Sequence, residues 1–249
     1  MSSRLALLGA LTMAATPALQ AATVAAPKKL LVVSVTKGFR HESIPVIEKV
    51  LQGLADQNRA FALDYARTDE ELAAKATVKS LVGFDGVVFA STTGDLPLPD
   101  RDGFVDWIAK GHAFVGIHAA TDTFPGFPAY LDMIGGQFKH HGPQTTVEVF
   151  VRDPKSPATA GLPKSWSVFD EIYQFQRYDP ARVHLLLAMD KHPETGEAGE
   201  LPLAWTRSHG RGRVFYTALG HREDVLEADW YKAHLLGGIR WALGLDEAH

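Results

Sequence analysis

Four short apolar segments, separated by amphipathic ones, constrain the fold of this chain more than any other feature. They cover residues Lys29–Val35, Ala60–Ala66, Asp85–Ala90 and Ala113–Ile117. Three of them are apolar almost without interruption, which is typical of strands in a parallel sheet that is covered on both faces, whereas Ala60–Ala66 alternates. Strands that alternate with helices predict an α/β fold: a doubly wound, mostly parallel, flavodoxin-like sheet with helices on both faces.

Helix signals stand between and after these strands. Ser43 precedes a segment with apolar residues at helical spacing, so we expect it to cap a helix that begins near Ile44. An acidic segment after Thr68 indicates another helix start, because negative charge is favourable at a helix N-terminus. Further helices are expected over Leu98–Lys110 and from about Val225 or Ala228 to Leu243.

The second half of the chain has a different pattern. A short helix, Ala129–Ile134, precedes a glycine-bounded loop, Gly135–Gly142, and an alternating strand, Thr145–Val151. Prolines interrupt the next stretch, so we expect the strands that follow to be antiparallel additions at the edge of the sheet. The candidates are Asp170–Tyr173, Val183–Met189, Leu203–Arg207 and Arg213–Leu219, with a hairpin loop over Asp190–Glu200.

The N-terminus has the layout of a secretory signal peptide. Arg4 precedes the apolar run Leu5–Ala15, and small residues lead to an expected cleavage after Ala21 or Ala22. The run is shorter than the roughly 20 residues of a membrane span, and no later stretch approaches that length. We therefore expect residues 1–22 to be a signal peptide, 23–28 a linker and 29–245 one α/β domain, with a periplasmic or secreted mature protein.

Composition excludes several functions. The formal net charge is −4 and no run of basic residues occurs, so neither nucleic acid nor an anionic membrane surface is an expected partner. The chain has no cysteine, which excludes disulfides, thiolate metal ligands and a thiol nucleophile. A monomer and a homo-oligomer both stay open.

Histidines follow three of the predicted strands, where ligands bind in open α/β sheets. His118 ends the strand within Gly111–Phe124, His41 follows the first strand and His221 follows the last. His140 and His141 lie in the glycine-bounded loop, from which they could reach the same crevice. For His118 the alternative is a core histidine that is satisfied by a backbone carbonyl.

Two kinds of chemistry fit these residues. In the first, His118 and His221 transfer protons, and the carboxylate of Glu223 fixes the tautomer of His221. In the second, a divalent metal such as zinc is bound by His118, His140, His141 and His221. Substrate hydroxyls would be oriented by polar side chains nearby, which are Arg40, His41, Asp122, Glu171 and Tyr173.

Several motifs together resemble one known family. They are Thr36–Ser43, Gly116–Ala120, Gly135-Gly136 with His140-His141, Asp170–Tyr173, and Gly212–Tyr216 with Gly220-His221. In this order and spacing they are similar to the trehalose-utilisation (ThuA-like) family, from about Lys29 to Leu243. That family resembles the class I glutamine amidotransferases in fold, in which a cysteine on a strand-to-helix elbow works with a late His-x-Glu.

The resemblance implies a function in carbohydrate metabolism. His118 stands where the amidotransferase nucleophile would be, so hydrolysis of glutamine through a thioester is excluded. The family points to keto derivatives of disaccharides, and we expect an exported enzyme that acts on a glycoside or keto-sugar by isomerisation, hydrolysis or elimination. The alternatives are a non-catalytic sugar-binding or accessory protein, and an exported domain with a vestigial crevice.

Overall fold

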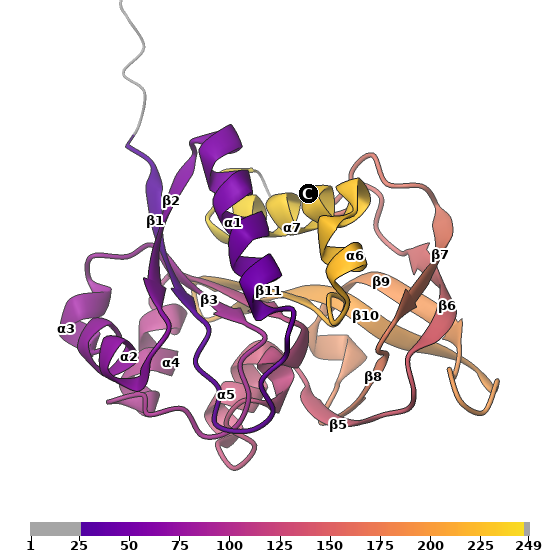
Figure 1. Cartoon of the computed structure of the whole chain (residues 1–249), viewed down its shortest axis with the longest axis horizontal. Coiled ribbons are helices and arrows are strands. Elements are labelled where there is room, and N and C mark those ends of the chain that lie inside the picture. Colours follow the sequence, from indigo (N-terminus) through magenta and orange to yellow (C-terminus); the bar gives the residue numbers. More distant parts are fainter. Residues whose placement is uncertain (1–25, 247–249) are drawn as a thin grey trace, which may run out of the picture.

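The computed structural model describes residues 26–246 and is built around one nine-stranded mixed sheet (Figure 1). The predicted signal peptide and residues 23–25 of the predicted linker lie outside the described residues. The strand order is β2-β1-β3-β4-β11-β10-β9-β6-β7, and β5 and β8 form a separate two-stranded sheet. The predicted α/β class, with a mostly parallel sheet, is confirmed. No helix among residues 26–246 is long and apolar enough to cross a membrane.

The first half of the chain supplies most of the parallel part of the sheet. Its elements are β1 Lys28–Val33, α1 Ile44–Asn58, β2 Phe61–Ala66, α2 Asp69–Lys75, α3 Val78–Leu81, β3 Gly86–Ala90, α4 Arg101–Ala109, β4 Ala113–Ile117, the 3₁₀ helix η1 His118–Asp122 and α5 Pro128–Ile134. Strands β3 and β4 are buried along their whole length, as their apolar sequences predict. Ser43 is the N-cap residue of α1, as predicted, but its side chain makes no capping hydrogen bond.

The second half extends the sheet with antiparallel strands. Its elements are β5 Gln137–His141, β6 Thr145–Val151, β7 Ser165–Asp170, β8 Tyr173–Gln176, η2 Pro180–Arg182, β9 His184–Lys191, β10 Ala198–His209, β11 Gly212–Thr217, α6 Glu223–Glu227 and α7 Asp229–Ala242. Strands β10, β9, β6 and β7 pair antiparallel, as expected.

Three predictions for this half are corrected. Strand β11 is not an edge addition, because it pairs parallel with β4 in the middle of the sheet. The loop predicted over Gly135–Gly142 contains β5, which pairs with β8. The strand predicted over Asp170–Tyr173 is instead a break, since β7 ends at Asp170 and β8 begins at Tyr173. Polar residues and glycines hid the short β5 from sequence analysis; it pairs with β8 and contributes Phe138 to the core.

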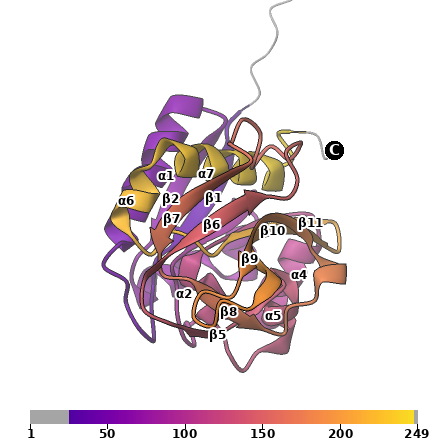
Figure 2. The same ribbon diagram turned by 90° about the vertical axis from the view of Figure 1, so that its right-hand side faces the viewer.

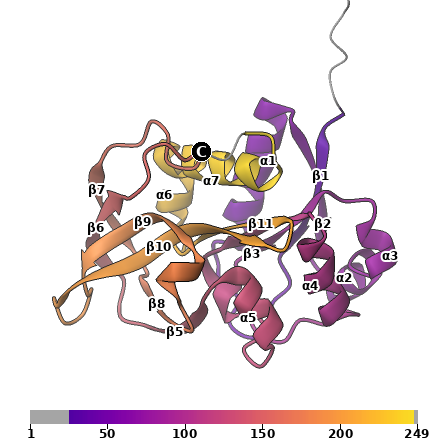
Figure 3. The same ribbon diagram turned by 180° about the vertical axis from the view of Figure 1, so that it is seen from behind.

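Helices cover both faces of the sheet. Helices α1, α6 and α7 pack on one face, and α2 to α5 lie on the other (Figures 1 and 2). The two-stranded sheet lies beside α5 (Figure 3), and its aromatic residues join the core on that second face. The two cores meet at the sheet, so the carboxyl ends of β1, β4 and β11 are held at one edge by packing on both sides.

His234 on α7 is the most buried histidine outside that edge. Its Nδ1 lies 2.7 Å from the carbonyl oxygen of Ala158, and its side chain is completely buried. Burial lowers the pKa of His234 to about 4. The folded chain therefore binds a proton at this position only at a much lower pH than the unfolded chain does.

We expect His234 to reduce stability in acid. The pKa of an unfolded histidine is about 6.5, so the unfolded chain takes up the proton first as the pH falls, and stability is lost between about pH 6.5 and pH 4. Urea unfolding at pH 7 and pH 4 should show wild type losing about 3 kcal/mol more than His234→Gln, which keeps an N–H donor but does not titrate. Equal losses in the two proteins would contradict this assignment.

Candidate functional site

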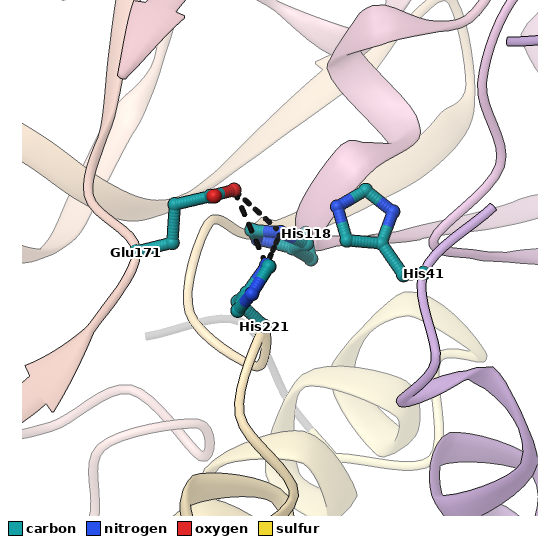
Figure 4. Close-up of side chains that lie close together, drawn as sticks. All are labelled: His41, His118, Glu171 and His221. Atoms are coloured by element: carbon teal, nitrogen blue, oxygen red, sulfur yellow. Dashed lines mark hydrogen bonds and ion pairs between the residues drawn. The ribbon is translucent and has the colours of Figure 1, made fainter. Parts of the chain in front are cut away.

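Three histidines and one glutamate converge at the carboxyl edge of the parallel strands (Figure 4). His41 follows β1, His118 follows β4 and His221 follows β11, while Glu171 comes from the break between β7 and β8. One nitrogen or oxygen atom of each residue lies within 4.8 Å of the corresponding atom of every other. The strand-end histidines of the sequence thus meet in one place, and Glu171 joins them.

His118 is presented by a strained turn. Its φ is +48°, in the left-handed region that non-glycine residues rarely adopt, and its side chain is 0% exposed. The Tyr216 hydroxyl donates to the His118 backbone carbonyl at 2.7 Å. The Nδ1 atom of His118 lies 2.7 Å from the Ala218 carbonyl oxygen, and because a carbonyl only accepts, Nδ1 carries the proton. Nε2 is the nitrogen that remains for the site.

Glu171 is the common neighbour of the imidazoles. Its Oε2 lies 3.4 Å from Nε2 of His118 and 3.2 Å from Nδ1 of His221, and its Oε1 lies 3.3 Å from Nδ1 of His141. Burial opposes ionisation of Glu171, but the adjacent imidazoles of His118 and His221 outweigh it and hold its pKa well below the usual range. The carboxylate is therefore charged at neutral pH.

His41 closes the cluster on the side of α1. Its side chain is 5% exposed, and its ring lies edge-on to the rings of His118 and His221, with centroids 4.7 and 5.3 Å apart. Burial and the other imidazoles lower the pKa of His41 to about 3. His221 behaves differently, since its contact with Glu171 raises its pKa. His41 is therefore neutral at physiological pH, and one of its ring nitrogens has a lone pair available for a ligand.

A cavity of about 230 Å³ opens over the cluster. It is lined by Phe39, His41, Asp122, Phe138, His141, Glu171, Tyr173 and His221. The Tyr173 ring lies 4.4 Å from that of His118, and burial raises the Tyr173 pKa far above the usual value. Burial also raises the pKa of Asp122. Asp122 is held at the cavity by its position at the end of η1.

The two histidines of β5 point to different places. His141 contacts Glu171 and lines the cavity. The Nε2 atom of His140 instead lies 2.9 Å from Glu194 in the β9–β10 turn, outside the cluster. Neighbouring side chains of a strand face opposite sides, so the two could not both reach the site.

Glu223 and Arg40 lie beside the cluster and not in it. Glu223 begins α6, is exposed, and lines a second cavity; the carboxylate next to His221 is that of Glu171. Arg40 donates from its guanidinium to the Ser34 carbonyl at 2.8 Å and lines the same second cavity. The expected pairing of Glu223 with His221 is therefore replaced by a contact from a distant segment.

Asp170 is a supporting residue that sequence reasoning missed. Its completely buried carboxylate accepts hydrogen bonds from the backbone N–H groups of Gly220 (2.8 Å) and Arg222 (3.1 Å), the two neighbours of His221. Asp170 thereby fixes the loop that carries His221, while the next residue, Glu171, contacts its imidazole. Its only signal in the sequence is its position beside Glu171.

We expect Asp170→Asn to loosen the His221 loop. One buried backbone N–H would face an amide nitrogen in place of an acceptor, which costs about 1–3 kcal/mol of unfolding free energy. Urea unfolding measures the loss, and the NMR shifts of His221 report the displacement. The matched control is Asp179→Asn, because Asp179 is exposed and accepts one N–H, from Ala181. A loss no larger than that of the control would show that Asp170 is not a support.

The chain is similar to one protein family in sequence and to solved members of it in fold. A family model described as trehalose utilisation (ThuA) matches residues 29–242. A ThuA-like protein from Parabacteroides merdae has a TM-score of 0.72 at 20% identity, over 90% of this chain and 92% of its own. One from Bacteroides uniformis has a TM-score of 0.71 at 22% identity, over 90% and 94%. Structures this distant in sequence show the fold alone.

A more remote similarity is to part of a large enzyme. The β-galactosidase from Bacillus circulans sp. alkalophilus matches 87% of this chain with 30% of its own, at 15% identity and a TM-score of 0.53. No curated protein matches the chain significantly. The family model nevertheless covers most of the chain, which confirms the resemblance seen in the sequence. The protein belongs to the trehalose-utilisation (ThuA) family.

Proposed function

We propose that this protein is an enzyme of carbohydrate metabolism that acts on a keto-sugar or glycoside at a divalent metal centre. The metal would be held by His118, His221 and Glu171, and the ring of His41 lies beside these three. Family membership supports the link to carbohydrates. The spacing of the ligand atoms carries the metal assignment.

Three ligand atoms have the separation that zinc requires. Nε2 of His118, Nδ1 of His221 and Oε2 of Glu171 lie 3.2 to 3.4 Å from one another. Ligands at about 2.0–2.1 Å from a tetrahedral zinc ion lie roughly 3.3 Å apart. Three protein ligands and a cavity on the open side are the pattern of catalytic zinc sites.

The polar atoms of the cluster are poorly satisfied without a ligand. Within residues 26–246, neither Oε2 of Glu171 nor Nδ1 of His41 forms a hydrogen bond of normal geometry, although both atoms are buried. A buried polar atom without a partner is costly, and a cation would satisfy it. The Ala218 carbonyl orients His118 from behind, as supporting groups do for metal-bound histidines.

The remaining groups of the cavity fit proton transfer. A bound divalent metal would polarise a substrate carbonyl or hydroxyl. Asp122 lines the cavity, and its raised pKa suits a group that exchanges a proton with a sugar carbon or hydroxyl. His141 lies beside Glu171 at the same cavity. This arrangement favours isomerisation or elimination of a keto-sugar, because both begin with removal of a proton next to the carbonyl.

Export is the second part of the proposal. It is supported by the sequence of residues 1–22 alone, which combines Arg4, an apolar run and small residues before the expected cleavage. Expression of the full chain in a Gram-negative host, followed by N-terminal sequencing of the periplasmic product, tests it. A product that retains Met1 and stays with the cytosolic fraction would exclude export.

The amount of metal bound per chain should depend on His118 in the cluster and not on His140 outside it. We expect purified wild type to bind about one zinc or similar ion per chain and His118→Asn to bind it far more weakly. Loss of a supporting contact alone costs about 10–100-fold in metal affinity. Asparagine tolerates positive φ and can donate to Ala218, so the fold should be retained. The measurements are elemental analysis and isothermal titration.

His140→Asn is the matched control, because His140 pairs with Glu194 outside the cluster. It should bind metal as wild type does. Equal loss in the two variants would place the metal elsewhere, and metal binding that survives His118→Asn and Glu171→Gln would exclude the proposed centre.

Turnover should require both the metal and Asp122. We expect wild type to convert keto-trehalose, chelation to abolish the reaction and zinc or manganese to restore it. Asp122→Asn should lower kcat by about 10²–10⁴-fold, the contribution of one acid–base group, while metal content stays normal. Full activity of metal-free protein would instead favour proton transfer by His118 and His221. Sugar binding without turnover by any metal form would favour a non-catalytic binding protein.

A further inference from the structure

A second and larger cavity adjoins the one over the cluster. Its volume is about 680 Å³, and Phe39 and His221 line both cavities. Its other lining residues are Arg40, Glu42, Ser43, Gln144, Arg222, Glu223, Asp224 and Glu227. The two cavities are therefore neighbouring parts of one crevice.

The smaller cavity holds only a small group. Its volume of about 230 Å³ is below the roughly 300–1,000 Å³ of typical small-molecule sites. A molecule with its reacting part over the cluster would extend past Phe39 into the larger cavity. Phe39 is 67% exposed, and its ring lies edge-on to His41 at 4.9 Å, so its free surface is a platform between the two cavities.

The larger cavity is lined by a buried hydroxyl and by exposed carboxylates. The Ser43 side chain is 2% exposed, and its hydroxyl has no hydrogen-bond partner among residues 26–246. The Glu42 and Glu223 side chains are exposed and line the same cavity. A buried hydroxyl without a partner is costly, which indicates that a ligand satisfies it.

The charges of this cavity select against anions. Four carboxylates line it, against two guanidinium groups. Arg222 is already occupied, because its guanidinium contacts Asp224 at 2.9 Å and Gln144 at 3.0 Å. Arg40 likewise donates to the Ser34 carbonyl. Carboxylates accept hydrogen bonds from hydroxyls and repel phosphate or carboxylate groups.

We propose that the larger cavity binds the part of the substrate beyond the reacting ring, and that it selects an uncharged, polyhydroxylated group over a phosphorylated one. This inference rests on the proposed function, since that function places the reacting ring over the cluster. Glu42, Glu223 and Ser43 accept or donate hydrogen bonds to the second ring, and Phe39 packs against the link between the rings. Glu223 is therefore a specificity residue.

Binding of unreactive sugars to the full chain tests the proposal without turnover. Isothermal titration with trehalose, methyl α-glucoside and trehalose 6-phosphate compares two neutral rings, one ring and a phosphorylated pair. We expect trehalose to bind at least about tenfold more tightly than either of the others. Glu42→Ala and Glu223→Ala should each weaken trehalose about tenfold, as loss of a hydrogen bond to a charged group does, and methyl α-glucoside less than about threefold.

Glu70→Ala is the control for charge, because Glu70 is exposed on α2 and lines neither cavity. It should leave all three affinities unchanged. Equal affinities for trehalose and methyl α-glucoside, equal losses for both in the variants, or no binding of any sugar would overturn the subsite. Selective binding of trehalose without turnover of its keto derivative would refute the proposed function and support the subsite.

Discussion

The contact between an ionised carboxylate and buried imidazoles is the constraint on which the rest of the site depends. Glu171 comes from the antiparallel part of the sheet and meets His118 and His221, which follow the parallel neighbours β4 and β11. A buried carboxylate pays a large desolvation penalty, and His118 offers it no hydrogen bond, because the proton of that ring is on Nδ1. The antiparallel extension therefore does more than widen the sheet, because it brings a carboxylate to the three histidines.

Backbone geometry prepares this contact. The positive φ of His118 turns its side chain back over the sheet edge, and three hydrogen bonds, from Tyr216, to Ala218 and between Thr121 and Tyr216, hold the turn. A strained backbone conformation of this kind is retained only where several surrounding contacts hold it in place. Asp170 holds the His221 loop in place in a similar way, because its carboxylate accepts hydrogen bonds from two backbone N–H groups of that loop. Rigid supports of this kind keep ligand atoms about 3.3 Å apart before any ion binds.

The sequence predicted the fold better than the site. Short apolar runs such as Ala113–Ile117 predict buried strands, and the parallel order of the first strands brings His41 and His118, which follow two of them, to one edge. The place of His221 did not follow from this pattern, because the strand before it was expected as an antiparallel edge addition and instead pairs parallel with β4. The role of Glu171 did not follow either, because it depends on a break between β7 and β8 that no local pattern marks. Glu223 was chosen for its proximity in sequence to His221, yet α6 begins there and carries its side chain into the larger cavity. Local spacing predicts contacts within an element and fails for contacts between distant segments.

The turn after β4 illustrates that one backbone conformation can present side chains with unrelated chemistry. A strand that ends in a left-handed residue exposes that side chain to the crevice whatever the residue is. A thiol in this position would be a nucleophile, but an imidazole whose Nδ1 is bound to the Ala218 carbonyl offers only the Nε2 lone pair. That lone pair faces a carboxylate and a second imidazole, an arrangement that suits a metal ligand better than an attacking group. A turn of the same geometry can therefore carry a thiol or an imidazole, and the chemistry that it supports depends on the side chain and not on the fold.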